Sequence, residues 1–177
     1  MDGARRSWPH WSTVALLGVQ IPVGLFMVRY GVATDFAAPS GILYDGHKLL
    51  GLLILLLAAV RLAYRLARGA PSSEFSLAAW QKTRSHVTHV YAMLLAVPLL
   101  GWLGISYYGP FRPFGLALPV LAAENGDRAQ RFFALHRLAA YALIVLIGMR
   151  VGAALFHYFV RKDGVMRSML ASAGQRA

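Results

Sequence analysis

The sequence has no cysteine and few charged residues among its 177 positions. Without cysteine the chain cannot form disulfides, zinc–cysteine sites or cysteine-ligated iron–sulfur clusters, and it cannot use thiol catalysis. Charged residues make up 14% of the chain, against roughly 25% in soluble domains. Hydrophobic residues make up 58%, which excludes intrinsic disorder. The composition therefore argues against a soluble protein.

Four apolar stretches are long enough to cross a bilayer, which requires about 20 predominantly apolar residues. They cover residues 11–28, 49–66, 87–108 and 132–160. No connection between them is long enough to separate two domains, so we predict one domain over residues 1–177. The predicted fold class is an all-α integral membrane protein, a four-transmembrane-helix bundle. A cleaved signal peptide is the alternative for the first stretch, but that stretch is unusually long and no A-x-A site follows it.

The connection at residues 109–130 is rich in proline and glycine, which break any spanning helix. We expect its LALPVLAAE segment to form a short surface helix. We expect Asn125 and Gly126 to form a turn before the fourth stretch.

Acidic residues are scarce. The chain has 7 Asp and Glu against 18 Lys and Arg, which gives a net charge of +11. Eleven of the Lys and Arg lie before the first stretch, within residues 61–84, and after the fourth stretch. Cytoplasmic loops of membrane proteins carry such an excess, so we predict that both termini are cytoplasmic. The charge is then explained by topology and by contact with anionic lipid, and nucleic-acid binding has no further support.

With no cysteine and few carboxylates, the histidines are the main residues left that could carry polar chemistry. Every apolar stretch has one near the point where the chain enters the membrane. The six are His10, His47, His86, His89, His136 and His157. Ionisable groups within a membrane are costly and indicate a functional role by default. The alternative is that they simply lie among lipid headgroups, which a histidine at every stretch disfavours.

The alternating direction of the stretches pairs these histidines by depth. The first and third stretches start on the inner side, so His10 and His89 can face each other there. The second and fourth start on the outer side, so His47 and His136 can do the same at the outer level. Each pair can hold a haem iron between two imidazoles within a helix bundle. We therefore predict a bundle that encloses two b-type haems, bound non-covalently because no C-x-x-C-H motif is present.

Two alternatives stay open for these ligands. Zinc is the competing metal, and it is disfavoured because structural zinc normally has four protein ligands. His86 lies three residues before His89 on a similar helix face and is the alternative inner ligand. We prefer His89 because it lies deeper in the apolar run.

Arginine and glycine residues support the cofactor interpretation less specifically. Arg61 and Arg65, four residues apart on the inner half of the second stretch, can bind haem propionates or extend to lipid phosphate. Small residues let a large ring approach the backbone, or serve ordinary helix packing. Those that we single out are Gly46, Gly51, Gly148 and Gly152.

Over nearly its whole length the chain resembles the bacterial cytochrome b561 family of four-helix dihaem membrane proteins. The motifs that carry the resemblance are His10-Trp11, His47 with its nearby glycines, Arg61 and Arg65, the HVTHVY segment at 86–91, the FGLALP loop, His136 and the final AALFHYFVRKD. One departure is Arg150, which stands where the family often has a histidine. The pairing of His10 with His89 leaves that histidine unnecessary as a ligand.

The resemblance implies an activity, because members of this size are similar to superoxide oxidases that pass electrons from periplasmic superoxide to ubiquinone. This would make the chain an oxidoreductase of the bacterial inner membrane. His136, Lys48 and Arg137 are then the candidate catalytic residues at the outer haem, with Arg131 nearby, because positive charge attracts a small anion. At the inner end, His157, His86 and Arg150 are the candidate ubiquinone-binding residues, with His157 delivering a proton.

Two further hypotheses remain open. The bundle can be an electron-relay subunit between quinone and a separate periplasmic dehydrogenase or hydrogenase, which would be its redox partner protein. It can also be a membrane protein without haem, such as a small transporter, whose histidines need not pair by depth.

Overall fold

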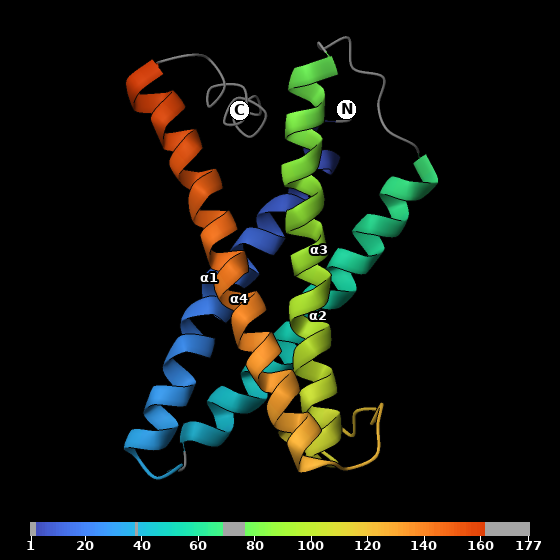
Figure 1. The fold of residues 1–177 in the computed structure, drawn as a ribbon, viewed down its shortest axis with the longest axis vertical. Coiled ribbons are helices and arrows are strands. Elements are labelled where there is room, and N and C mark those ends of the chain that lie inside the picture. The colour runs from blue at the N-terminus through green and yellow to red at the C-terminus, as the bar shows by residue number, and fades with distance from the viewer. Residues whose placement is uncertain (1–2, 38, 69–76, 162–177) are drawn as a thin grey trace.

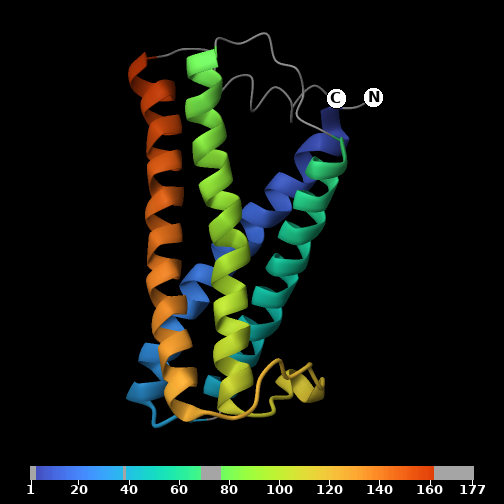
Figure 2. The same ribbon diagram turned by 45° about the vertical axis from the view of Figure 1, so that its right-hand side comes forward.

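A computed structural model describes residues 3–37, 39–68 and 77–161, with side chains for residues 11–37, 39–64, 67 and 88–160. Four long α-helices form a bundle: α1 (Gly3–Ala33), α2 (Pro39–Arg68), α3 (Leu77–Tyr108) and α4 (Gly126–Phe156). A 3₁₀ turn, η1 (Pro113–Gly115), lies between α3 and α4, and a π-helical segment, η2 (His157–Arg161), continues α4. The start of α1 and the end of α4 lie at one end of the bundle (Figures 1 and 2).

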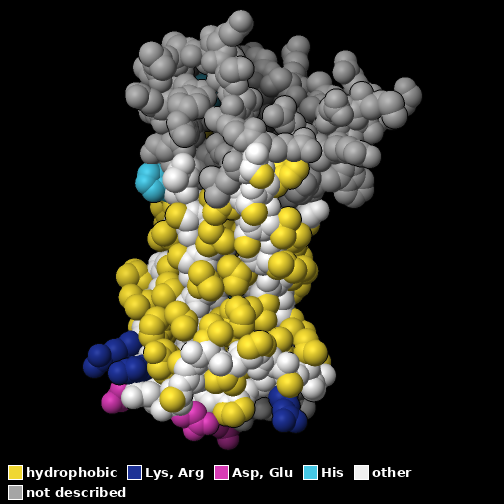
Figure 3. Space-filling model, turned by 90° about the vertical axis from the view of Figure 1, so that its right-hand side faces the viewer, with side chains coloured by type: hydrophobic (Ala, Val, Ile, Leu, Met, Phe, Trp, Pro, Cys, Tyr) yellow, Lys and Arg dark blue, Asp and Glu magenta, His cyan; other side chains and the backbone are white. Residues whose placement is uncertain are grey.

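The four helices are apolar enough to span a membrane over Trp11–Ala33, Pro39–Tyr64, Thr88–Tyr108 and Gly126–Val160. This confirms the predicted fold class of four transmembrane helices. Hydrophobic side chains cover most of the described surface on the face that Figure 3 shows, and charged side chains gather at the end formed by the α1–α2 and α3–α4 connections. Apolar side chains remain exposed along all four helices, for example Phe26, Leu56, Leu99 and Val145, as contact with lipid requires.

The helices extend beyond the apolar stretches that predicted them. Helix α2 begins at Pro39 and α4 at Gly126, where the Asn125 side chain accepts a hydrogen bond from Arg128 N at 3.0 Å. Such an N-cap satisfies a backbone donor at the helix start, so α4 begins before its apolar run does. As a result, His47 and His136 lie more than two turns inside their helices, and not at the helix edges as the apolar stretches suggested.

The connection from α3 to α4 contains no short surface helix over residues 116–124, so that expectation was wrong. Pro119 disfavours a helical residue before it, and its carbonyl accepts a hydrogen bond from Trp102 Nε1 at 3.1 Å. Pro113 in η1 is fully buried, and Asn125 N donates to Tyr107 O at 2.8 Å. These contacts hold the connection against the C-terminal end of α3.

The interior of the bundle is small. Its buried cluster consists of Ile54 and Ala58 from α2, Leu94 from α3 and Leu143 from α4. Half-buried residues of α1, including Leu16 and Leu17, pack against this cluster. The cluster lies next to the cavity that holds the candidate site, because Ile54, Leu94 and Leu143 also line that cavity.

Candidate functional site

The structure brings His47 of α2 and His136 of α4 together, as the pairing by depth predicted. Their ring centroids are 6.1 Å apart and the ring planes are perpendicular, at 89°. An imidazole nitrogen binds a first-row metal at about 2 Å, so two imidazoles on opposite sides of one metal have ring centres about 6 Å apart. The two rings therefore have the separation that one shared metal centre requires.

Each ring lies against a glycine on the neighbouring helix. A Cβ at Gly24 of α1 would lie 2.7 Å from His47 Cε1, and a Cβ at Gly101 of α3 would lie 3.0 Å from His136 Nδ1. Any larger residue at either position would displace the imidazole. The glycines thus form a seat for each ring between the paired helices.

The hydrogen bonding of the two rings differs. His136 Nδ1 lies 2.8 Å from the carbonyl oxygen of Val97. A carbonyl only accepts, so Nδ1 carries the hydrogen and Nε2 keeps the lone pair that can bind a metal. His47 Nδ1 is buried and has no hydrogen-bond partner. Each candidate ligand therefore has a glycine seat, but only His136 has a hydrogen-bond partner for its Nδ1.

Both histidines line a cavity of about 530 Å³ that all four helices and the α3–α4 connection enclose. This volume lies in the range of cofactor and ligand sites. The wall is mainly apolar and aromatic, with Trp102, Phe111 and Phe133 among its residues. Three cationic residues also line the cavity, namely Arg29, Lys48 and Arg137. An apolar slot with a cationic margin suits a flat hydrophobic ring that carries carboxylates.

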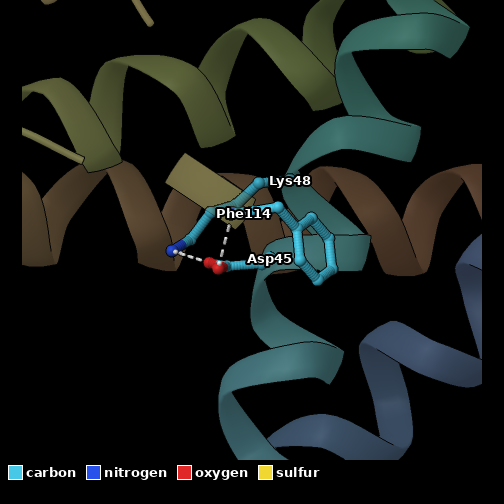
Figure 4. A network of polar contacts seen from close by, with 3 residues as sticks. All are labelled: Asp45, Lys48 and Phe114. Carbon is cyan, nitrogen blue, oxygen red and sulfur yellow. Dashed lines mark hydrogen bonds and ion pairs between the residues drawn. The ribbon is translucent and has the colours of Figure 1, made fainter. Parts of the chain in front are cut away.

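A polar cluster fixes the connection over this end of the bundle (Figure 4). Lys48 Nζ and Phe114 N both donate to Asp45, at 3.1 Å to Oδ1 and 3.1 Å to Oδ2 respectively. Phe114 has a φ of 50°, a strained value for a bulky residue, and this hydrogen bond helps to hold it there. Lys48 also lies 5.8 Å from the centroid of the Phe111 ring. The Lys48 charge is thus shared with Asp45, whereas Arg29 and Arg137 are exposed.

A model of prokaryotic cytochrome b561 matches residues 6–172. The chain belongs to the prokaryotic cytochrome b561 family. Cytochromes of this family are membrane electron-transfer proteins, so the chain is a multi-pass bacterial membrane protein in contact with the lipid bilayer. The resemblance seen in the sequence motifs is thereby confirmed.

Named relatives cover most of this cytochrome b561 chain. Cytochrome b561 homolog 2 of Escherichia coli is 26% identical over 176 residues, which are 93% of this chain and 88% of the relative. Probable superoxide oxidase CybB of Yersinia pestis is 30% identical over 128 residues, 70% of this chain and 72% of the relative. Cytochrome b562 of Cereibacter sphaeroides is 27% identical over 163 residues, 91% of this chain and 89% of the relative.

Membership of the cytochrome b561 family implies b-type haem, and the residues of the cavity fit that group. The donor set is two imidazoles on opposing helices, one of which has its Nδ1 hydrogen fixed on a carbonyl. Gly24 and Gly101 leave the space that each ring needs. The remaining wall is apolar, which suits a haem held without a covalent bond.

For the other predicted site residues, the structure gives fewer contacts or no side-chain position. The side chains of His10, Arg65 and His86 lie outside the described residues. His89, Arg131 and Arg150 are exposed, and His157 is half-buried at the start of η2. The Arg61 guanidinium lies 5.7 Å from the centroid of the Tyr91 ring, a cation–π contact between α2 and α3.

Sequence reasoning missed several residues of the site. Gly24, Gly101, Gln20 and Arg29 line the cavity, yet none was singled out. A Cβ at Gly46, Gly148 or Gly152, which were singled out, would meet no atom within 4 Å. The signal for the missed glycines is their position on the partner helix opposite each histidine, and that requires the helix rotations that only the structure gives.

Proposed function

We propose that this cytochrome b561 is a superoxide:ubiquinone oxidoreductase of the bacterial inner membrane. In the balanced reaction, two superoxide anions release two electrons and leave as two O₂ molecules. One ubiquinone accepts those electrons together with two protons and becomes ubiquinol. The observation that carries this proposal is the His47–His136 pair within an apolar, four-helix cavity of a cytochrome b561.

His47 and His136 hold the outer of two haems in this proposal, and His10 and His89 hold the inner one, with His86 as the alternative ligand. Haem b between two imidazoles supplies one-electron transfer and has no open coordination position. Arg61 and Arg65 are positioned on the inner half of α2 to bind propionates of the inner haem. His136 is the ligand at which electrons enter the protein.

At the outer side, cationic residues attract superoxide. Arg29 and Arg137 line the cavity from opposite helices and are exposed, so their charge reaches an approaching anion. Lys48 contributes less net field because Asp45 lies 3.1 Å from its ammonium. Arg131 is exposed and is not part of the cavity wall. The similarity to a probable superoxide oxidase of Yersinia pestis supports this choice of electron donor.

At the inner side, ubiquinone reaches the protein through the lipid. Arg150 is exposed on α4, and His157 follows seven residues later where the helix becomes a π segment. We assign Arg150 and His157, with His86, to binding ubiquinone, the arginine as a donor to a quinone oxygen and the histidine as the proton source. The concentration of Lys and Arg near both termini supports a cytoplasmic location for this side.

The decisive experiment uses the full-length protein in liposomes that contain ubiquinone. A superoxide pulse should reduce both haems rapidly, with saturable kinetics, and ubiquinol should form at one per two superoxide anions. Slow, unsaturable reduction of the haems would instead assign the chain to electron relay for a separate periplasmic dehydrogenase or hydrogenase. A reduced-minus-oxidised spectrum without b-type haem would refute both assignments.

A further inference from the structure

The two histidine seats have the same arrangement, a glycine against the ring and a backbone carbonyl one helical turn before that glycine. His136 lies against Gly101, and its Nδ1 contacts the carbonyl of Val97, four residues earlier on α3. His47 lies against Gly24, and the residue four positions earlier on α1 is Gln20, whose backbone faces the His47 ring. Residues four apart lie one turn from each other on the same helix face. The carbonyl of Gln20 therefore occupies the place in the first hairpin that the Val97 carbonyl occupies in the second.

The His136 seat includes a hydrogen bond to the ring, and the His47 seat does not. The Val97 carbonyl and His136 Nδ1 are in hydrogen-bond contact at 2.8 Å. No partner of His47 Nδ1 satisfies hydrogen-bond geometry. A buried imidazole N–H without an acceptor is costly, so a small adjustment of α1 against α2 is favoured once His47 binds a metal through Nε2.

The first hairpin also has a side-chain contact between its two helices, made by Gln20. Gln20 Nε2 donates to the backbone carbonyl of His47 itself, at 2.9 Å. This approach depends on Gly51, because a Cβ there would lie 3.2 Å from Gln20 Nε2. The packing is reciprocal, since His47 fits against a glycine of α1 and Gln20 fits against a glycine of α2. The Oε1 atom of Gln20 is buried without a partner, so the amide is held by Nε2 alone.

We propose that Gln20 is the positioning residue for His47, an inference that rests on the proposed role of His47 as a haem ligand. Its side-chain amide ties the α2 backbone at His47 to α1, and its backbone carbonyl is the acceptor that His47 Nδ1–H reaches once α1 adjusts against α2. A hydrogen bond to the distal nitrogen of a metal-bound imidazole fixes the ring orientation and raises the basicity of the ligand. Gln20 thus sets the angle between the two outer imidazoles and the potential of the outer haem.

The test compares haem-loaded variants by low-temperature electron paramagnetic resonance and by redox titration. Gln20→Met keeps the side-chain length and removes the amide, and Gly51→Ala presses on Gln20 Nε2 from the other helix. Leu16→Met is the matched control, because it is a volume-conserving change on the same helix at a residue that packs in the core outside the cavity wall. The ferric signal of a bis-histidine haem depends on the angle between its imidazole planes, which is 89° here.

Gln20→Met and Gly51→Ala should both shift the outer-haem signal and raise its potential, or weaken outer-haem retention by about 10-fold or more. The inner haem and the Leu16→Met variant should be unchanged. Wild-type signal and potential in both variants would overturn the proposal, and so would equal shifts of the two haems, which would indicate general packing. Retention of both haems in His47→Ala would refute the proposed function itself, whatever the Gln20 variants show.

Discussion

The half of the bundle that carries the α1–α2 and α3–α4 connections, which we propose to be the outer half, is built differently from the half that carries the two termini, the proposed inner half. In the outer half, both candidate ligands lie against glycines, one is bonded to a backbone carbonyl, and Asp45 fastens the α3–α4 connection above them. In the other half, His89 and Arg150 are exposed, whereas Arg61 and His157 are half-buried. One end is fastened by these contacts and the other has exposed candidate residues, so the two ends suit different electron partners.

A small anion in water needs only a charged approach and a fixed ligand pair, because outer-sphere electron transfer requires no contact with the iron. A quinone in the lipid needs an accessible protein surface and a source of protons. The contrast between the two halves therefore matches the two half-reactions that we propose. It also determines which substitutions should affect each half separately.

The largest expected effect is the loss of one haem. His47→Ala and His136→Ala each remove an imidazole from the 6.1 Å pair, so the protein should keep only the inner haem. The haem content per chain, measured by reduced-minus-oxidised absorbance, should fall from two to one. His157→Ala is the matched control and should retain both haems, because its imidazole belongs to neither pair. If the His47 and His136 variants kept two haems, these residues would not be ligands of an outer haem, and the proposed difference between the two halves would fail.

The second effect tests the glycine seats. Gly24→Ala and Gly101→Ala place a methyl group 2.7 and 3.0 Å from the respective imidazoles. The rings must shift, so outer-haem affinity should fall by about 10- to 100-fold, measured by haem transfer to an apo-acceptor protein. Gly18→Ala on α1 is the control, because its Cβ would meet nothing within 4 Å. Unchanged affinity in the Gly24 and Gly101 variants would mean that the seats do not determine ligand placement.

The smallest effect concerns charge at the outer half. Arg29→Gln and Arg137→Gln should lower the second-order rate of haem reduction by superoxide by up to about tenfold at low ionic strength. Added salt should reduce the difference in this rate between each variant and the wild type, because salt screens exposed charges. Arg131→Gln lies outside the cavity wall and should change the rate less. An equal loss in all three variants would show that only net charge matters.

Much of the architecture could be predicted from the sequence. Apolar length predicted four spans, and the alternating helix direction predicted that His47 and His136 share a level. Both follow from one-dimensional properties of the chain. The seats at Gly24 and Gly101 and the amide of Gln20 could not be predicted, because they depend on how each helix is rotated about its axis. The non-helical 116–124 segment was also missed, since Trp102 holds the Pro119 carbonyl through a contact between residues 17 apart in the sequence.

His47 and His136 belong to different hairpins, the first to α1–α2 and the second to α3–α4. A cofactor held by both residues therefore links two halves of the chain that can enter the membrane one after the other. Its binding energy adds to the stability of the assembled bundle and not to that of either hairpin alone. Because the proposed ligands come from different hairpins, we expect this site to form only after both hairpins have packed together.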